Sequence, residues 1–523
     1  MDIPSKWTEE ADVIVVGYGG AGAVAAIMAH DAGARVLILE KQPGNTSVQT
    51  RHTPSTSMSG GGFFSTTDEE QARFYLEGMV KIANETLNPE RKEVLSVFAK
   101  YLVDNKNWIR SIGVETGDKE QMEPIIRGAM IKNPQFTPDG GMLIADFPEL
   151  PGAESVSIYI TKPLDGYTHG AALFRALSNA VTARGIGVLW ETKGEHLVTE
   201  GGQVRGIIAC QNERRMAIKA RRAVILTCGG FEFNDWLKEN YLKVNPAYFI
   251  GNPANTGDGV NMALEVGAAL WHMNCASWRA VMKFPDFPIA FATAHHEMAS
   301  IFVDKTGKRF ANERYRMHSF GYQLTNYDDA LYYPRVPCYW IFDEKRRADG
   351  PLASAHGACS RIRGVPDSSY YVWSQDNYTE INRGWVTKAG TLEELARKLG
   401  DETHNGGKMR SSNLKEAVEQ FNRYCQKGED TDFHRPQWSL TPVDEPPYYA
   451  VNLWPGGPNT QGGPKRNNRA QVLRPDNTPI PRLYSAGELG SVWGMFYQAG
   501  GNIAECIAFG RIAGANAAAE KIW

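Results

Sequence analysis

The first forty residues pair short apolar runs with a stretch of small residues, in an order that predicts strand, helix and strand. Residues 12–16 (DVIVV) form an uninterrupted apolar run, which is typical of a parallel strand buried on both faces. Residues 21–32 are mostly small helix-forming residues, and residues 36–39 form a second apolar run that ends at Glu40. The pattern therefore predicts a β-α-β unit at the start of the chain.

The turn between the first predicted strand and the helix reads GYGGAG, from Gly17 to Gly22. Gly17, Gly19 and Gly22 allow a tight turn in which backbone N–H groups reach a pyrophosphate at the helix N-terminus. Glu40 follows about 20 positions later, where a carboxylate binds a ribose 2′-hydroxyl and repels the extra phosphate of NADP. Strand, turn, helix, strand and acid in this order predict that the chain binds a dinucleotide.

The pattern changes several times over the next 200 or so residues. Residues 44–67 are rich in Gly, Ser and Thr, and we expect them to form a loop that wraps a ligand. Helical periodicity follows over 68–112, and short β-rich runs over 187–226 predict an antiparallel meander. A further helix is expected through 256–267.

Residues 276–440 differ from both flanking segments, with many aromatics and prolines at irregular spacing and a predicted helix at 392–399. An α/β pattern resumes at 448 and ends in a long predicted helix over 502–521. Since 523 residues exceed the size at which one core stays compact, we expect 276–440 to form a separate cap domain. Most of its aromatic residues are expected to fill the core of that cap.

The charge balance and the cysteines exclude several kinds of partner. The chain has 56 basic and 59 acidic residues and a net charge of -3, which gives no electrostatic basis for binding nucleic acid or an anionic membrane surface. Its seven cysteines show neither CxxC nor zinc-ligand spacing, so no metal site is expected and a reducing compartment is favoured. The apolar stretch 13–29 belongs to the nucleotide turn rather than to a membrane span. We therefore expect a cytoplasmic protein.

A second candidate cofactor contact lies near the C-terminus. A predicted strand over 483–486 leads to Gly487 and Glu488, and Glu488 is positioned to bind a ribityl hydroxyl. The Gly500-Gly501-Asn502 segment begins the last long helix, whose free N–H groups and positive dipole end suit negative charge on the N1 to C2=O edge of a reduced flavin. The two ends of the chain together predict a flavin site.

Six motifs carry a resemblance to a known group, and in chain order they are GYGGAG, RAVILTCGGF, NTGDGVNMALEVGA, GKRFANE, LYSAGEL and GGNIAECIAFGRIAG. Together they resemble the flavoproteins of the fumarate reductase and 3-ketosteroid dehydrogenase superfamily over essentially the whole chain. The resemblance implies an α/β fold with a Rossmann-like, glutathione reductase-like FAD-binding domain and an inserted α+β cap domain. It implies an FAD domain built from residues 1–275 and 441–523, with the cap at 276–440 closing over the flavin.

The resemblance also assigns residues to FAD, among them the two glycine turns, the charged residues that follow them and a Gly-rich loop. The expected contacts are Gly17, Gly19, Gly20, Ala21, Gly22, Glu40, Lys41, Thr46, Ser47, Ser59, Gly60, Gly61, Gly62, Thr227, Gly229, Gly230, Asp258, Gly487, Glu488, Gly501, Asn502 and Ile503. His52 resembles only loosely the histidine that bonds flavin covalently in respiratory succinate dehydrogenases, because its sequence spacing from the glycine turn differs. FAD is therefore expected to bind non-covalently.

Fumarate reductases hold two carboxylates and need cationic or fork-shaped donors at both ends of the pocket. At the matching positions this chain has Asn459 in the HTMGG-like segment and Gln498 in place of an arginine. The relay arginine falls on His296, and the catalytic arginine falls on Met317. A small dicarboxylate is therefore not the expected substrate, and the expected substrate contacts are His295, His296, Gln498 and Asn459.

Ketosteroid dehydrogenases of the superfamily carry a Tyr followed four residues later by a Gly whose N–H joins the phenol in polarising a ketone. Tyr497 and Gly501 have that spacing. As hydride leaves or reaches the carbon β to the carbonyl, charge builds on the oxygen, and two preorganised donors in a dry pocket stabilise the enolate. The resemblance therefore implies that Tyr497 and Gly501 bind the substrate carbonyl.

A further group must handle the proton at the α-carbon of the substrate. Residues 312–316 lie where the superfamily places its acid or base, and Tyr315 is the expected group, with Arg316 as the alternative. A phenol with a pKa of about 10 is a poor base at neutral pH, but flanking guanidinium groups lower that value.

These residues predict an FAD enzyme that forms or reduces a C=C bond conjugated to the carbonyl of an apolar, ketosteroid-like substrate, by hydride transfer at flavin N5. The chain contains no haem-binding CxxCH motif, so an external electron donor or acceptor is expected. A reductase of an unsaturated monocarboxylate, with Arg314 or Arg316 as the carboxylate partner, is the main alternative. A flavin oxidase and an electron carrier are the others.

Overall fold

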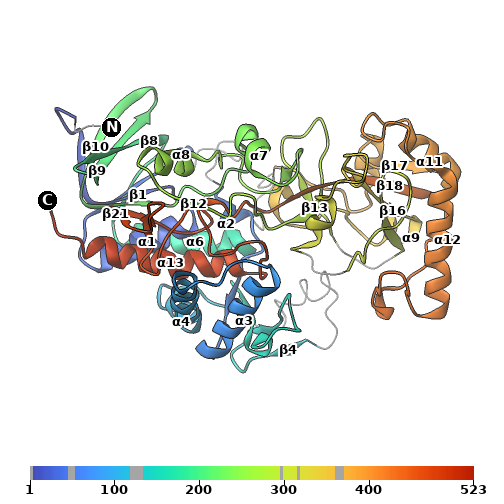
Figure 1. Ribbon diagram of the computed structural model, residues 1–523, viewed down its shortest axis with the longest axis horizontal. Helices are drawn as coiled ribbons and strands as arrows, with labels where there is room; N and C mark the ends of the chain where they lie inside the picture. The colour runs from blue at the N-terminus through green and yellow to red at the C-terminus, as the bar shows by residue number, and fades with distance from the viewer. Residues whose placement is uncertain (1–3, 45–52, 118–133, 295–298, 315–317, 360–369) are drawn as a thin grey trace.

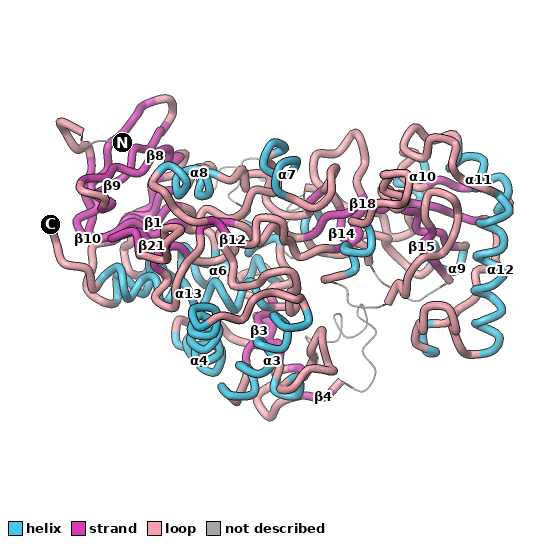
Figure 2. Tube along the Cα trace, in the orientation of Figure 1, coloured by secondary structure: helices cyan, strands magenta, loops and turns pink. Residues whose placement is uncertain are grey.

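The fold was analysed in a computed structural model of the 523-residue chain. The structure describes residues 4–44, 53–117, 134–294, 299–314, 318–359 and 370–523. The molecule is elongated, with one β-sheet near each end and a small helical and β region below the first sheet (Figures 1 and 2). Both chain termini lie at the end that holds the first sheet.

The first sheet contains the expected β-α-β unit. Strand β1 (Glu9–Val16) leads through α1 (Gly20–Asp31) to β2 (Val36–Leu39), and β1 pairs in parallel with β2. The strand order is β20-β21-β10-β1-β2-β7, and all the pairs from β21 to β7 are parallel. The further strands are β7 (Gly187–Leu189), β10 (Arg214–Leu226), β20 (Gln471–Leu473) and β21 (Pro479–Ser485). The predicted Rossmann-like arrangement is therefore confirmed.

An antiparallel meander extends this sheet, as the alternating pattern predicted. Strand β8 (Thr192–Glu200) pairs with β9 (Gln203–Gln211), and β9 pairs with β10. The expected helix near residue 256 is shorter than predicted and spans Asp258–Glu265 (α8). Its first residue, Asp258, therefore lies at a helix N-terminus, where the helix dipole favours a carboxylate.

The second sheet has the order β14-β13-β18-β16-β15, with β11 and β17 also pairing with β18. Its strands are β11 (Tyr248–Phe249), β13 (Arg279–Met282), β14 (Phe291–Ala292), β15 (Ser300–Val303), β16 (Cys338–Phe342), β17 (Thr387–Ala389) and β18 (Tyr448–Gly457). Helices α11 (Leu392–Gly400) and α12 (Ser411–Lys427) pack at its outer end (Figure 1).

The middle strand of the second sheet comes from outside the range predicted for the cap. The sequence pattern grouped β18 with the nucleotide-binding half, but β18 pairs with β13 and β16. Strand β18 joins the second sheet although it lies beyond residue 440, because a strand's sheet is decided by distant partners and not by its own pattern. The division of the chain into ranges 1–275, 276–440 and 441–523 stays a prediction.

A third region lies under the first sheet (Figure 1). Its strands are β3 (Gly62–Ser65), β4 (Gln135–Phe136), β5 (Met142–Leu143) and β6 (Ser157–Ile160), and its helices are α3 (Glu69–Ile82), α4 (Pro89–Ser111) and α6 (His169–Ala183). Asp68 and Asn88 cap α3 and α4 by accepting the N–H groups of Gln71 and Arg91. Segment 44–67 was expected to form a loop, but part of it forms regular secondary structure, since β3 and α2 (Ser55–Met58) lie within it.

Short elements complete the described fold. They are the strand pair β12 (Leu270–Trp271) and β19 (Gly463–Pro464), and the helices α7 (Asp235–Tyr241), α9 (Glu344–Ala348) and α10 (Tyr378–Asn382). The last helix, α13 (Gly501–Ala518), is the long C-terminal helix that the sequence predicted.

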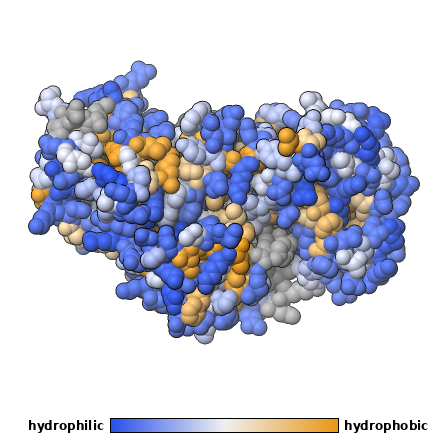
Figure 3. All heavy atoms as spheres, viewed as in Figure 1, coloured by the Kyte–Doolittle hydropathy of each residue, from blue (hydrophilic) through white to orange (hydrophobic). Residues whose placement is uncertain are grey.

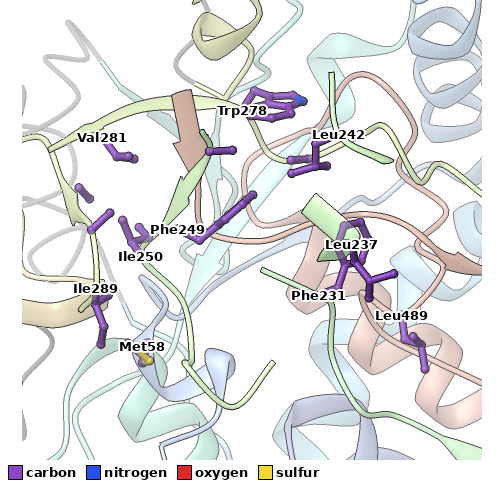
Figure 4. Close-up of a cluster of buried hydrophobic side chains, with 14 of the residues drawn as sticks. Met58, Phe231, Leu237, Leu242, Phe249, Ile250, Trp278, Val281, Ile289 and Leu489 are labelled. Atoms are coloured by element: carbon purple, nitrogen blue, oxygen red, sulfur yellow. The ribbon is translucent and has the colours of Figure 1, made fainter. Parts of the chain in front are cut away.

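One apolar core runs from the first sheet into the second. It joins Ile14 and Leu226 to Trp340 and Val451 through a junction of buried side chains. Figure 4 shows that junction, where Phe231 and Leu237 of one half lie near Phe249 and Trp278 of the other. The expectation that most cap aromatics fill the core is confirmed for Trp278, Phe284, Phe291, Tyr339 and Trp340, whereas Tyr332 is exposed.

The outer surface is mainly hydrophilic on the face shown in Figure 3, with small apolar patches. Within the described ranges, no helix combines the length and apolarity needed to cross a bilayer.

Helices α1 and α13 pack directly against each other through small residues. A Cβ atom on Gly514 would overlap the carbonyl oxygen of Ala25 and lie 2.8 Å from the Cβ of Met28. A Cβ on Gly510 would lie 2.9 Å from the Cβ of Val24. The two helices therefore depend on glycine for their separation.

We predict that Gly514→Leu lowers the free energy of unfolding by about 1–3 kcal/mol or more, because the added side chain has no space. Urea unfolding followed by circular dichroism measures the change. Ala519→Leu, which adds the same side chain type at an exposed position, should change stability by about 0.5 kcal/mol or less. Equal effects of the two variants would contradict the packing argument.

Candidate functional site

A cleft opens at the carboxyl ends of β1, β2 and β10, at the turn into α1. Its empty space, part of which is open to solvent, is about 750 Å³. Many of the predicted cofactor contacts line it, namely Gly17, Gly19, Gly20, Ala21, Glu40, Lys41, Thr227, Gly229, Asp258, Gly487 and Glu488. The structure therefore brings the two ends of the chain to one cleft.

The glycines of the turn have different roles. Gly17 has φ +101°, and a Cβ there would lie 2.5 Å from the carbonyl oxygen of Thr227. Gly22 does not line the cleft, since its missing Cβ makes room for the carbonyl of Gly17. Near Gly19 a Cβ would meet only Pro54, at 3.8 Å, so the backbone there faces open space. A phosphate group can approach the N-terminus of α1 at that point.

Glu40 is held in one orientation by the backbone. Its Oε2 accepts the N–H of Tyr18 at 2.8 Å, and its Oε1 accepts the N–H of Gln42 at 2.8 Å. The side chain is 7% exposed and lines the cleft. A fixed carboxylate at this place suits a ribose hydroxyl donor, as the sequence predicted.

Lys41 and Asp258 form an ion pair beside the cleft. Lys41 Nζ lies 2.6 Å from Asp258 Oδ2, and Lys193 Nζ lies 3.2 Å from Asp258 Oδ1. Burial alone would raise the pKa of Asp258, but the two lysines outweigh it and hold that pKa below the usual value. Lys193 was missed in the sequence because no motif marks it within the predicted meander of residues 187–226.

Two buried carboxyl groups meet at the other end of the cleft. Glu488 Oε1 accepts the N–H of Gly230 at 2.6 Å and the side-chain amide of Asn255 at 3.0 Å. Glu232, which the sequence analysis missed, accepts the N–H of Thr460 at 3.1 Å. Burial raises the pKa of both carboxyls, and the charge of Glu488 raises the pKa of Glu232 further. The pair therefore retains a proton above the pH at which a free carboxyl loses it.

The Gly-rich loop at 59–62 packs against α6 instead of lining the cleft. Ser59 Oγ donates to the carbonyl of Thr56 at 2.7 Å, and Gly170 N donates to the carbonyl of Ser59. Gly61 has φ +69° where it meets the backbone of His169. The neighbouring residues Pro54, Ser55 and Thr56 line the cleft, and Thr56 Oγ1 accepts the N–H of Gly20 at 3.0 Å. Thr46, Ser47 and His52 lie outside the described residues.

The start of α13 holds the predicted carbonyl-binding residues. Tyr497 is 7% exposed, and its Oη accepts the N–H of Asn502 at 3.4 Å. The N–H of Gly501 donates to the carbonyl of Gln498 at 2.9 Å, so this donor is already used within the turn. Gly501 is a glycine because the Trp493 ring occupies the space of a Cβ atom. Ile503 follows in the first turn of α13 and does not line the cleft.

The Tyr497 phenol remains protonated at neutral pH. Burial raises the pKa of Tyr497 above its usual value, although the amides of Asn502 and Gly500 act in the opposite direction. A protonated phenol at a helix N-terminus is a hydrogen-bond donor for a carbonyl oxygen that gains negative charge.

Gln498 and Asn459, predicted as substrate contacts, are used inside the protein. Gln498 is fully buried, and its Oε1 accepts Tyr75 Oη at 2.5 Å and the N–H of Asp146 at 2.9 Å. Asn459 Oδ1 accepts the side-chain amide of Asn502 at 2.7 Å. Both residues therefore position the start of α13.

A group of ionisable side chains surrounds Tyr497 and was missed in the sequence. The ring of His318 packs edge-on against the Tyr497 ring, with centroids 5.1 Å apart, and its Nδ1 lies 3.4 Å from Asp146 Oδ2. Asp146 Oδ2 also accepts the N–H of Ala499 at 2.8 Å. Arg279 is close enough for its charge to interact with Asp146 and Tyr497. No motif indicates this group, because its members come from distant segments.

The remaining predicted site residues are placed as follows. Tyr315, Arg316, His295 and His296 lie outside the described residues. Arg314 lies over the ring of Trp438, with its guanidinium carbon 5.4 Å from the ring centroid.

The cleft fits FAD on the features above, because a glycine turn, a fixed acidic residue and a second acidic residue lie along it. We predict that Glu40→Gln weakens FAD binding roughly tenfold or more, since a charged hydrogen-bond acceptor is lost. Flavin retained after gel filtration, measured by absorbance, reports the change. Glu9→Gln at the exposed start of β1 is the control and should retain flavin as the natural protein does.

The carboxyl pair predicts a pH dependence of stability. Because the native pKa of Glu232 is raised above the usual value of 4.5, its contribution to stability is full below that pH and is lost as pH rises through the native pKa. Relative to Glu232→Gln, the natural protein should therefore lose stability in urea unfolding as the pH rises above 4.5. The exposed Glu239→Gln variant should show the same dependence of unfolding free energy on pH as the natural protein. If Glu232→Gln also shows that same dependence, the assignment is refuted.

The chain is similar to known proteins over nearly its whole length. The chain is 28% identical to a 3-oxosteroid 1-dehydrogenase of Mycobacterium tuberculosis, over 97% of this chain and 98% of that protein. It is 28% identical to a fumarate reductase (cytochrome) of Shewanella frigidimarina, over 98% of this chain and 77% of that protein.

The fold has a solved counterpart in a 3-ketosteroid delta1-dehydrogenase from Sterolibacterium denitrificans, crystallised with 1,4-androstadiene-3,17-dione. The two structures share a TM-score of 0.78 and 23% identity, over 98% of this chain and all of the other. A family model described as an FAD binding domain matches residues 12–503. The chain therefore belongs to the FAD binding domain family and is an FAD-dependent oxidoreductase related to 3-oxosteroid dehydrogenases and fumarate reductases.

Proposed function

We propose that the protein moves a hydride between FAD and the carbon β to a ketone, forming or reducing a C=C bond conjugated to that carbonyl. The observation that carries the proposal is the buried Tyr497 phenol over the N-terminus of α13. The similarity to 3-oxosteroid 1-dehydrogenases supports a ketosteroid-like substrate. The same groups serve both directions, because a donor that stabilises an enolate lowers the barrier for making it from either side.

The role of Tyr497 follows from its protonation state and position. As the β-carbon loses or gains hydride, the carbonyl oxygen becomes enolate-like and attracts the phenol proton more strongly. The amide of Asn502 and the helix N-terminus stabilise the growing charge on the phenol oxygen. For Gly501 to add a second hydrogen bond, its N–H must leave the carbonyl of Gln498. We retain Gly501 as a proposed contact on that condition.

When bound, FAD supplies two-electron chemistry at N5. The carboxyl pair of Glu488 and Glu232 positions hydroxyl groups of the cofactor through fixed acceptors, and the dense packing of the start of α13 excludes water from the phenol. The proton at the α-carbon is assigned to Tyr315 or Arg316, as the sequence predicted. His318, oriented by Asp146, is the described side chain that can relay that proton near Tyr497.

The similarity to fumarate reductases supports a second candidate, the reduction of an unsaturated monocarboxylate. That reaction needs a cation against the carboxylate, and Arg314 is engaged with Trp438. Arg316 remains the proposed partner for this candidate. A panel of enones, saturated ketones and unsaturated acids, tested by anaerobic bleaching or reoxidation of the flavin, separates the two.

We predict that Tyr497→Phe lowers kcat for the true substrate by on the order of 10² or more, because one preorganised donor to the enolate is lost. Steady-state kinetics with an artificial electron acceptor measures the effect, and flavin content confirms that the cofactor is bound. Tyr333→Phe removes a phenol that donates to the Lys243 carbonyl and accepts from the Tyr327 hydroxyl, and should retain full activity. Full activity in Tyr497→Phe would overturn the carbonyl assignment.

A further inference from the structure

Arg279 is a buried cation that lacks a counter-charge in direct contact. It is the first residue of β13, opposite Gly456 of β18, and is 5% exposed. Trp278 and Val281 on either side of it belong to the apolar junction in Figure 4. Within the part of the chain that the structure describes, its guanidinium makes neither a hydrogen bond nor an ion pair.

The other buried arginines of the described chain all have such partners. Arg466 pairs with Glu505, Arg435 with Glu313, and Arg346 donates to three backbone carbonyls. The same holds for the others, Arg91, Arg347 and Arg482. Burying an unpaired guanidinium is costly, so the exception at Arg279 requires an explanation.

The guanidinium nitrogens of Arg279 differ from those of the other buried arginines in their exposure. Several buried arginines have an occluded nitrogen without a partner, such as Nε of Arg346 and Nε of Arg466. Arg279 has no nitrogen of that kind, although it makes no hydrogen bond in the described chain. Its unpartnered N–H groups are therefore not completely occluded, although the side chain is buried.

Arg279 interacts electrostatically with Asp146, Tyr497 and His356. Burial lowers the pKa of Arg279 to about 10, against the opposing charges of Asp146 and Tyr497, so it stays charged at neutral pH. Burial, followed by repulsion from Arg279, His169 and His318, lowers the pKa of His356 to about 3. This imidazole is therefore neutral and can donate or accept a hydrogen bond beside the guanidinium.

Asp146 does not neutralise Arg279 by contact. Its Oδ2 accepts the N–H of Ala499 and faces Nδ1 of His318. The carboxylate thus holds the turn before α13 and orients an imidazole. A planar guanidinium with free N–H groups next to Tyr497 matches the fork geometry of a carboxylate.

We propose that the substrate carries a carboxylate in addition to its ketone, and that Arg279 binds this carboxylate while Tyr497 binds the carbonyl. The inference rests on the proposed function. It restricts the proposed substrate class to ketones that also carry a carboxylate, which are keto acids. One arginine can bind one carboxylate. This agrees with the sequence, which lacks the cationic groups that would be needed to bind a dicarboxylate. A neutral substrate would leave the buried charge unpaired, so Arg279 also selects against it.

The test compares two ring enones on the FAD-loaded enzyme, cyclohexenone and a cyclohexenone that bears a ring carboxylate. In the natural protein, kcat/KM for the carboxylated enone should exceed that for the neutral enone by roughly 10². Arg279→Met should remove this preference, because kcat/KM should fall for the carboxylated enone and stay unchanged for the neutral enone. Arg279→Lys, which keeps the charge without the fork, should retain part of it.

A binding measurement separates recognition from turnover. Cyclohexanecarboxylate has the anion and no carbonyl, and calorimetry on the oxidised holoenzyme should show a Kd that rises roughly 10²-fold in Arg279→Met. Arg383→Met, which removes a surface guanidinium paired with Asp286, should leave that Kd unchanged. Flavin content and the thermal midpoint of Arg279→Met confirm that the variant is folded.

The outcomes are distinct. Equal kcat/KM for the two enones in the natural protein, or an equal loss on both in Arg279→Met, overturns the carboxylate assignment. Binding of cyclohexanecarboxylate that depends on Arg279, together with no reaction of either enone, supports the carboxylate site and refutes the proposed ketone chemistry. Reaction of both enones without any effect of Arg279→Met refutes the site and leaves the ketone chemistry standing.

Discussion

The contact between α1 and α13 is the constraint on which the site depends. Gly510 and Gly514 let α13 lie directly on Val24, Ala25 and Met28, so the start of each helix is fixed relative to the other. One start presents the glycine turn at the cofactor cleft, and the other presents Tyr497 and Asn502. Two helix N-termini, each with a positive dipole end, thereby share one region of the molecule. A cofactor with a pyrophosphate and an electron-rich ring edge fits both.

Charge is divided between the two sides of this region. On the cofactor side, Glu232 and Glu488 are buried together and hold a proton, which suits hydrogen bonding to hydroxyl groups. On the substrate side, the guanidinium of Arg279 interacts with the carboxylate of Asp146 without contacting it and lies near the neutral imidazole of His356. Burying each of these ionisable groups costs free energy. Their presence inside the protein therefore indicates ligand groups of opposite charge or with complementary hydrogen-bonding atoms. The apolar core that joins the two sheets keeps both sides rigid.

The second sheet is built from more of the chain than one inserted segment. Strand β18 enters it from the C-terminal part, and β11 enters it from the part before residue 276. Arg279 on β13 and the turn before α13 are thus carried by elements that share hydrogen bonds and core with both halves. Relative motion of the two sheets would open the apolar core that joins them, which favours a site whose shape is set before substrate binds.

The sequence alone determined the features that depend on local pattern. The β-α-β unit, its Gly17 turn, Glu40, Glu488 and the α13 start are readable because strand period, helix period and turn glycines act within a few residues. Only the tertiary structure decided which groups are free. Gly501 donates its N–H to Gln498, β18 pairs away from its neighbours in sequence, and Arg279 is left without a counter-charge in contact. Each of these outcomes depends on partners far along the chain, which no local pattern encodes.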